Sequence, residues 1–313
     1  MIKQIYGKHT FYFSTLAILL SLIVFIFKSN SISLNELMIS LICLFLIISI
    51  GISHGAMDNY KANKLLKIYK IKNKSIFFII YILISAFVIF LWSLYSSYTL
   101  LFFLLVASYH FGREDTAFMH DGNSNLDQFL YLIKGSLIIF SPLFFHFDET
   151  LKIFETLLVN KKILVFLKDA HWIINVCISL SALGYFYFVY KNKFRDFEIF
   201  FLDFLSILIL NFVFSPLVAF TIYFCFLHSI RHIISISHEL DPGSFLNGAK
   251  IFIKKALPLT VVTATLYLLT IFFLSNSYGL NDVVIKVIFI GLASLTFPHI
   301  LLEYLIETNE KRN

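Results

Sequence analysis

Long runs of apolar residues, separated by short polar connections, form the dominant pattern along this chain. A helix needs about 20 apolar residues to cross the roughly 30 Å hydrocarbon layer of a bilayer. The runs have about this length, so they predict an all-α, polytopic transmembrane helical bundle of about ten spans. The predicted spans cover residues 10–27, 34–52, 76–95, 97–112, 128–146, 171–190, 197–214, 216–236, 256–275 and 283–303.

The composition agrees with a membrane protein. Hydrophobic residues make up 59% of the chain and charged residues only 14%, whereas a soluble domain has about 25% charged residues. The three cysteines lie inside apolar runs without CxxC spacing, so neither a disulfide framework nor a thiolate zinc site is indicated. No soluble domain or long linker interrupts the pattern. We therefore expect residues 1–313 to form a single integral-membrane domain, located in the cytoplasmic membrane.

The positive charges indicate how the chain is oriented. Its net charge is +6, but the lysines and arginines gather in short connections, a pattern typical of membrane orientation rather than of nucleic-acid binding. With ten spans, the clusters at 61–74, 191–195, 250–255 and 311–312 all fall on one side, which predicts that both termini are cytoplasmic. The connection 147–170 interleaves lysines with apolar residues and predicts an amphipathic helix on the outer membrane surface.

Half of the ten histidines fall at a similar depth in this topology. Polar side chains are costly inside a bilayer, so histidines that converge at one depth indicate a functional site. The remaining histidines lie at span ends or in connections, where solvated or interfacial roles are expected. The converging residues are His54, His110, His228, His232 and His299.

The motif HSIRH gives the clearest metal-binding signal. His228 and His232 are separated by one helical turn and share a helix face. Alone, the pair is better explained by hydrogen bonds to neighbouring carbonyls than by metal binding. His54 and His110 at the same depth favour a metal centre, because imidazole ligands suit iron, copper or zinc. The chain lacks HExxH and has only one HxxxH, so a mononuclear four-histidine ferrous site that binds dioxygen fits best.

Carboxylates follow two of the predicted ligands. Asp58 comes shortly after His54, and Asp115 comes shortly after His110. A carboxylate beside a ligating histidine often accepts the second ring N–H and so fixes the tautomer. We expect Asp58 and Asp115 to orient these two histidines; the alternative is that both are solvated charges at helix ends.

Three further polar residues lie near the predicted ligands. His299 and Glu303 share a helix face and are expected to line the cavity without touching the metal. Arg231 lies about 100° around the helix from each of its neighbours, so it cannot share the metal-facing stripe of HSIRH. We expect Arg231 to anchor the helix, either by pairing with an acidic residue of another helix or by reaching the headgroups.

Four motifs, HGAMD at His54, YHFGRED at His110, HSIRH at His228 and FPH at His299, resemble in order and spacing the Brp/Blh family of bacterial integral-membrane β-carotene 15,15′-dioxygenases. The resemblance spans about residues 45–305, and the span 10–27 looks like an addition to the common core. It implies cleavage of the central 15,15′ double bond of β-carotene by dioxygen into two molecules of all-trans-retinal, using ferrous iron, commonly to supply a rhodopsin. The family's iron ligands carry over by motif to His54, His110, His228 and His232.

The physical class of this substrate agrees with the composition. A C40 polyene dissolves in membrane lipid, so an enzyme that binds it gains from an apolar, aromatic-lined tunnel that opens into the bilayer. The 38 Phe and 16 Tyr residues are sufficient for such a lining, although most are expected to face lipid or pack helices. The alternative function is a non-catalytic membrane transporter or rhodopsin-biogenesis protein, whose histidines bind metal or protons without turnover.

The predicted orientation can be tested with topology reporters. A reporter fused after Arg312 and another inserted in the 61–74 connection should both report a cytoplasmic location, because both positions lie in lysine- and arginine-rich segments. Paired reporters active on opposite sides of the membrane provide the measurement. A periplasmic signal at either position would contradict the topology that brings the histidines to one depth.

Overall fold

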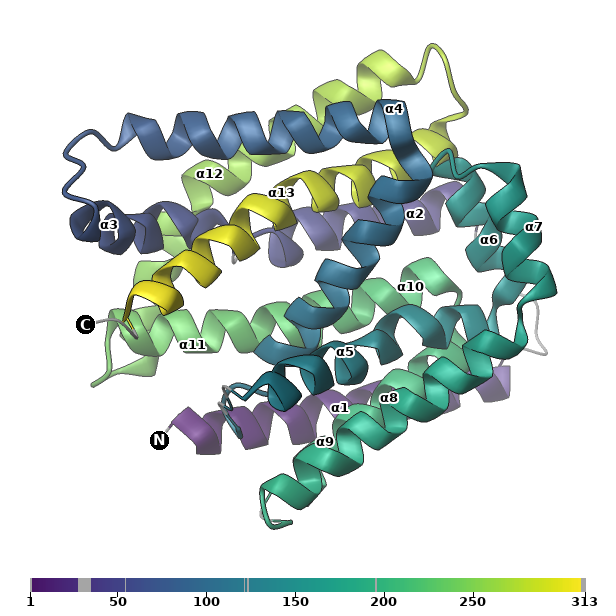
Figure 1. Ribbon diagram of the computed structural model, residues 1–313, viewed down its shortest axis with the longest axis horizontal. Helices are drawn as coiled ribbons and strands as arrows, with labels where there is room; N and C mark the ends of the chain where they lie inside the picture. The colour runs from purple at the N-terminus through teal and green to yellow at the C-terminus, as the bar shows by residue number, and fades with distance from the viewer. Residues whose placement is uncertain are drawn as a thin grey trace.

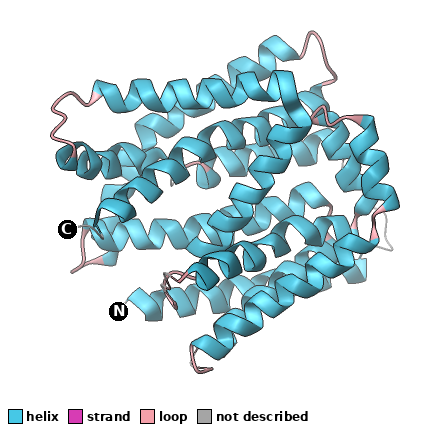
Figure 2. Cartoon of the chain, viewed as in Figure 1, coloured by secondary structure: helices cyan, strands magenta, loops and turns pink. Residues whose placement is uncertain are grey.

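The structure is a computed structural model that describes residues 2–27, 35–53, 55–120, 122, 124–194 and 196–310. Within these ranges the regular elements are all helical (Figure 2), which confirms the predicted all-α class. The long helices lie roughly alongside one another, and both chain ends lie on the same side of the bundle (Figure 1).

The helices follow one another with short connections, as the alternation of apolar runs and polar segments predicts. The first half of the chain forms α1 (Ile2–Phe27), α2 (Glu36–Leu46), the π-helix η2 (Ile47–Gly51), the short 3-10 helix η3 (Gly55–Met57), α3 (Asp58–Ile68), α4 (Ser75–Glu114) and α5 (Asn125–Phe145). The second half forms α6 (Phe147–Thr156), α7 (Lys161–Asp169), α8 (Trp172–Lys191), α9 (Phe197–Val213), α10 (Pro216–Ile222), the π-helix η4 (Tyr223–Ser229), α11 (Ile230–Leu240), α12 (Phe245–Leu274) and α13 (Leu280–Glu310).

Eight helical segments of the described chain are long and apolar enough to cross a membrane. The prediction of about ten spans differs for two reasons. Helix α4 contains both predicted spans 76–95 and 97–112 and bends sharply at Tyr95 (Figure 1), whose φ of −135° and ψ of 49° are not helical. Helix α9 has 17 residues, is shorter than each of these eight segments, and is not among them. The polytopic class is confirmed, whereas the number of spans and the location of the termini stay predictions.

The bend in α4 is held by hydrogen bonds to the connection between α6 and α7. The Ser96 hydroxyl donates to the Leu158 carbonyl at 2.5 Å, and the Asn160 amide donates to the Ser97 hydroxyl at 2.8 Å. These bonds satisfy polar groups where the helical pattern is interrupted, so the two halves of α4 can run in different directions. The bend contains no proline or glycine; the two serines that follow Tyr95 bond to the connection between α6 and α7.

The segment 147–170 was predicted to form one amphipathic helix, and the structure corrects this to two. Helix α6 ends at Thr156, Leu158 adopts a left-handed φ of 69°, and α7 begins after Asn160. The Asn160 side chain accepts a hydrogen bond from the Lys162 amide at 2.9 Å and caps α7. The asparagine in the middle of the segment is therefore a helix start, and the predicted location on the outer surface stays a prediction.

Helices α4 and α5 cross very closely at two glycines. A Cβ atom at Gly112 would collide with the Tyr131 carbonyl, and one at Gly135 would collide with the Ser108 carbonyl. Small residues let helix backbones approach in this way, which is how helices commonly pack in membranes. The crossing fixes the part of α4 that carries His110.

A buried ion pair joins three helices beneath this crossing. Arg231 of α11 donates two hydrogen bonds to the Asp203 carboxylate of α9, at 2.8 and 2.5 Å, and a third to the Thr10 hydroxyl of α1 at 2.6 Å. Arg231 is only 2% exposed and Asp203 only 1%. Of the two alternatives for Arg231, the structure therefore shows pairing with an acidic residue; the headgroup alternative was wrong.

This ion pair generates a stability prediction. Arg231→Leu leaves the Asp203 carboxylate buried without a counter-charge, so it should destabilise the fold by about 3–5 kcal/mol and reduce the folded protein recovered. Arg231→Lys should retain much of the stability because the charge remains. The double variant Arg231→Leu/Asp203→Leu should regain part of the loss, because no buried charge is left uncompensated. Size-exclusion profiles and thermal midpoints in detergent measure this; a stable, monodisperse Arg231→Leu protein would refute the anchoring role.

Candidate metal centre

Four histidines from three helical segments gather inside the bundle. They come from α4 (His110), from η4 and α11 (His228 and His232), and from α13 (His299), and all four are buried. The ring centroids of His110 and His228 lie 5.2 Å apart, those of His110 and His299 5.4 Å, and those of His232 and His299 5.6 Å. His54, the fifth histidine of the predicted set, lies outside the described residues.

Two π-helices flank the histidine cluster. His228 lies within η4, and η2 ends at Gly51, shortly before His54 in the sequence. The two π-helices are joined by a hydrogen bond from the Ser229 hydroxyl to the Gly51 carbonyl at 3.3 Å. π-Helical turns are rare and often occur at functional sites, because the wider turn redirects side chains. Both turns lie next to histidines that the sequence marks as candidate ligands.

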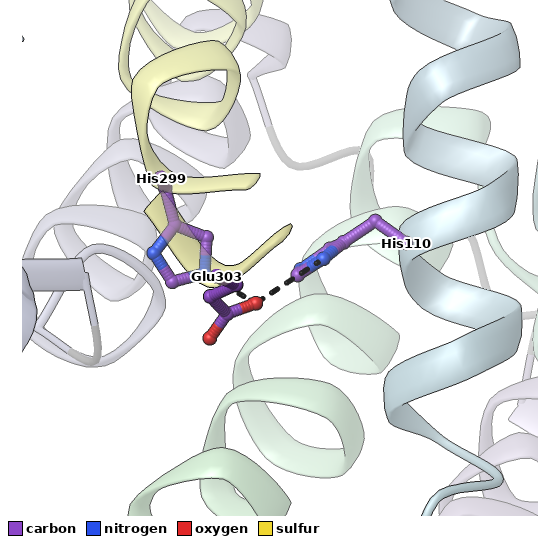
Figure 3. Close-up of side chains that lie close together, drawn as sticks. All are labelled: His110, His299 and Glu303. Carbon is purple, nitrogen blue, oxygen red and sulfur yellow. Dashed lines mark ion pairs between the residues drawn. The ribbon is translucent and has the colours of Figure 1, made fainter. Parts of the chain in front are cut away.

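Two histidines and a glutamate form a compact group suited to a metal ion. His299 and Glu303 project from α13 towards His110 of α4 (Figure 3). The nearer Glu303 oxygen lies 3.9 Å from His110 Nδ1 and 3.6 Å from His299 Nε2, and one potential ligand atom from each residue lies within 4.8 Å of the others. Two imidazoles and one carboxylate are the donor set of many non-haem Fe(II) oxygenases.

A second group of the same kind lies next to the first. It consists of Glu114, His232 and Glu303, whose potential ligand atoms also lie within 4.8 Å of one another. Glu114 was not predicted to be a site residue, and Glu303 was predicted to line the cavity without touching the metal. The HxxxE spacing of His110 with Glu114 and of His299 with Glu303 was the available signal, because such pairs share a helix face.

Asp58 contacts a different histidine from the one that the sequence suggested. Its carboxylate accepts a hydrogen bond from His299 Nδ1 at 2.8 Å and another from the Tyr81 hydroxyl at 3.0 Å. The predicted partner His54 lies outside the described residues. Asp58 begins α3 while His299 lies far along the chain in α13, so the contact depends on tertiary packing.

Asp115 was predicted to orient His110, and the structure corrects this assignment. Its carboxylate accepts a hydrogen bond from His228 Nδ1 at 3.2 Å and one from the Tyr223 hydroxyl at 2.6 Å. Five residues of helix rotate a side chain about 140° away from the starting face, so Asp115 turns away from His110. The two aspartates make the same kind of contacts: each accepts one hydrogen bond from a tyrosine hydroxyl and one from a histidine Nδ1. The Nε2 atom of each histidine is then the one that could bind a metal.

A largely apolar cavity of about 800 Å³ reaches the histidine cluster. His110, His299 and Asp58 lie on its wall. Its aromatic lining includes Phe77, Phe103, Phe111, Phe220, Phe224 and Tyr267. Two lining residues are also exposed on the outside of the bundle, Ile82 of α4 by 65% and Leu266 of α12 by 57%. The cavity therefore opens sideways between α12 and the first half of α4, which follows the upper edge of the bundle in Figure 1.

The two aspartates should tune the metal centre without forming it. Asp58→Asn and Asp115→Asn each replace a carboxylate acceptor of a histidine N–H, so each should weaken affinity for ferrous iron by about 10–100-fold without abolishing it. Anaerobic titration of the purified protein measures this affinity. Asp241→Asn, in the connection between α11 and α12, provides a control away from the cluster. Unchanged affinity in both site variants would argue against an orienting role.

Comparison with known proteins gives one consistent result. A family model described as beta-carotene 15,15'-dioxygenase matches residues 45–307. The chain is also 27% identical over 275 residues to a protein named beta-carotene 15,15'-dioxygenase from uncultured marine bacterium 66A03. The aligned region covers 86% of this chain and 94% of the relative. No solved structure matches at a significant level. Because the family match spans well over half of its length, the chain belongs to the beta-carotene 15,15'-dioxygenase family.

Proposed function

We propose that this chain cleaves the central 15,15′ double bond of β-carotene with dioxygen, in an iron-dependent reaction that yields two molecules of all-trans-retinal. Family membership identifies the chain as an enzyme of this type. The observation that carries the proposal is the position of His110 and His299: both belong to a cluster of potential metal ligands and to the wall of an apolar cavity of about 800 Å³.

The donor set fits ferrous iron. Imidazole nitrogens supported by a carboxylate bind this ion, and the described cluster contains no cysteine of the kind that an iron–sulfur site requires. We assign iron binding to His54, His110, His228 and His232, with Asp58 and Asp115 holding neighbouring rings. When bound, ferrous iron would supply dioxygen activation. The chain's own task is to hold the donors in a fixed arrangement and in the correct tautomers.

The cavity accounts for the substrate. An aromatic and aliphatic lining binds a polyene through apolar contacts and excludes water from the region around the cluster. The sideways opening between α4 and α12 would admit β-carotene from membrane lipid. Within this cavity, the position of the polyene relative to His110 and His299 would determine which double bond lies beside the metal, and therefore which bond is cut.

The proposal extends to location and partners. We propose a multi-pass protein of the cytoplasmic membrane, with residues 1–313 forming one integral-membrane domain. The first helix, α1, packs onto this domain through the bond between Thr10 and Arg231. Retinal released into the lipid phase would be available to a rhodopsin. A non-catalytic role in transport or rhodopsin biogenesis would use the same cluster without turnover, and the following experiment separates the two.

Expression in a β-carotene-producing bacterium tests the function. Orange colour should fade while retinal appears in lipid extracts. His54→Ala, His110→Ala, His228→Ala or His232→Ala should each abolish retinal formation and iron binding, because each removes a ligand. His171→Ala, an exposed histidine that packs against Phe147, should retain both. Unchanged β-carotene with iron-loaded wild-type protein would favour the non-catalytic role, and full activity in any of the four ligand variants would remove that residue from the iron site.

A further inference from the structure

Three helical segments each contribute a pair of potential ligands separated by one helical turn. Residues at i and i+4 share a helix face and lie about 6 Å apart along the axis, so each pair reaches two different depths. All three segments run from right to left in Figure 1, the second half of α4 more steeply than the other two. The first members of the pairs lie near one another, and so do the second members. The pairs are His110 and Glu114, His228 and His232, and His299 and Glu303.

The first layer consists of three histidines. His110 has its ring centroid 5.2 Å from that of His228 and 5.4 Å from that of His299. Asp115 holds His228 through Nδ1, and Asp58 holds His299 in the same way. This layer contains two of the proposed iron ligands, His110 and His228, and places His299 beside them.

The second layer consists of one histidine and two glutamates. His232 Nδ1 lies 3.4 Å from a Glu114 oxygen, and His232 Nε2 lies 3.6 Å from Glu303 Oε1. One histidine and two carboxylates form a donor set that binds divalent cations such as Fe²⁺ and Mn²⁺. The two layers adjoin through Glu303 and through the ring of His232, whose centroid lies 5.6 Å from that of His299.

Glu303 faces both layers with different oxygens. Its Oε2 is the atom near His110 and His299, at 3.9 and 3.6 Å, whereas its Oε1 is the atom near His232. A carboxylate that directs one oxygen to each of two cation positions has the geometry of a bridging ligand, as in the carboxylate-bridged sites of helical bundles.

A lysine already brings positive charge to the second layer. Lys61 Nζ lies 2.6 Å from Glu303 Oε1 and 3.2 Å from His232 Nε2. The lysine side chain is 17% exposed, and its long flexible stem allows the ammonium group to withdraw when another cation enters. The position is therefore one where the protein stabilises a cation.

We propose that the centre holds two divalent metal ions bridged by Glu303, the second bound by Glu114 and His232 at the position of the Lys61 ammonium group. The inference rests on the proposed function for the first ion. It moves His232, assigned above to iron binding, to the ligands of the second ion, beside Glu114 and Glu303. The second position lies on the far side of Glu303 from His110 and His299, which border the cavity.

Metal counting on the purified full-length chain tests this. After anaerobic loading with Fe²⁺ or Mn²⁺, the unmodified protein should contain about two ions per chain and Glu114→Gln about one. Lys61→Met should retain both ions and bind the second about 10-fold more tightly, because the competing ammonium group is gone. Glu307→Gln, one turn further along α13 and paired with Arg113, is the matched control and should retain both ions.

Electron paramagnetic resonance of the Mn²⁺-loaded protein gives a readout independent of activity. A carboxylate-bridged pair should show exchange coupling in the unmodified protein and in Glu307→Gln, while Glu114→Gln should show only isolated Mn²⁺. About one uncoupled ion per unmodified chain would overturn the inference. A second ion found only in Lys61→Met would not rescue it, because the Lys61 ammonium group would then be the cation that occupies this position in the natural protein. β-Carotene cleavage with one ion per chain would leave the proposed function intact. Two coupled ions without any cleavage would support the second site and contradict the proposed function.

Discussion

The cost of burying polar groups in an apolar bundle governs the arrangement of this protein. A carboxylate or guanidinium removed from water is tolerated only where opposite charges and hydrogen bonds surround it. Arg231 illustrates the constraint, because it meets Asp203 directly and Asp115 at 3.9 Å. Asp115 in turn holds His228. The ion pair that joins α1, α9 and α11 is therefore continuous with the contacts that position the metal centre, and a change in one reaches the other.

The same constraint explains why tyrosines lie behind the aspartates. A carboxylate that only accepts one histidine N–H has unused lone pairs, and in a site that excludes water these need other donors. Tyr223 supplies one to Asp115 and Tyr81 supplies one to Asp58. Tyr81 and Tyr223 also line the cavity. The wall that contacts an apolar ligand thus also satisfies the polar groups behind it.

The sequence was sufficient to predict the all-α class and the meeting of His110, His228 and His232, because helix direction and span order fix the depth of each residue. It was not sufficient to assign partners across helices. Asp115 follows His110 closely in sequence but contacts His228, and Asp58 contacts His299. Such pairings depend on helix rotation, which apolar runs do not specify when most faces are hydrophobic. The contact between Lys61 and the histidine cluster was missed for a related reason. Lys61 belongs to a lysine cluster that indicates membrane orientation, but its ammonium group donates a hydrogen bond to Glu303.

The sideways opening of the cavity between α4 and α12 affects how the kinetics of such an enzyme should be described. A ligand that arrives through lipid is encountered at a frequency set by its mole fraction in the bilayer, and its bulk concentration in a detergent or vesicle suspension has no direct meaning. Adding inert lipid at constant protein and carotenoid would slow encounter by surface dilution, although nothing in the centre has changed. Saturation constants for a ligand that enters by this route therefore belong on a two-dimensional scale, and values obtained in different amounts of lipid become comparable only after that conversion.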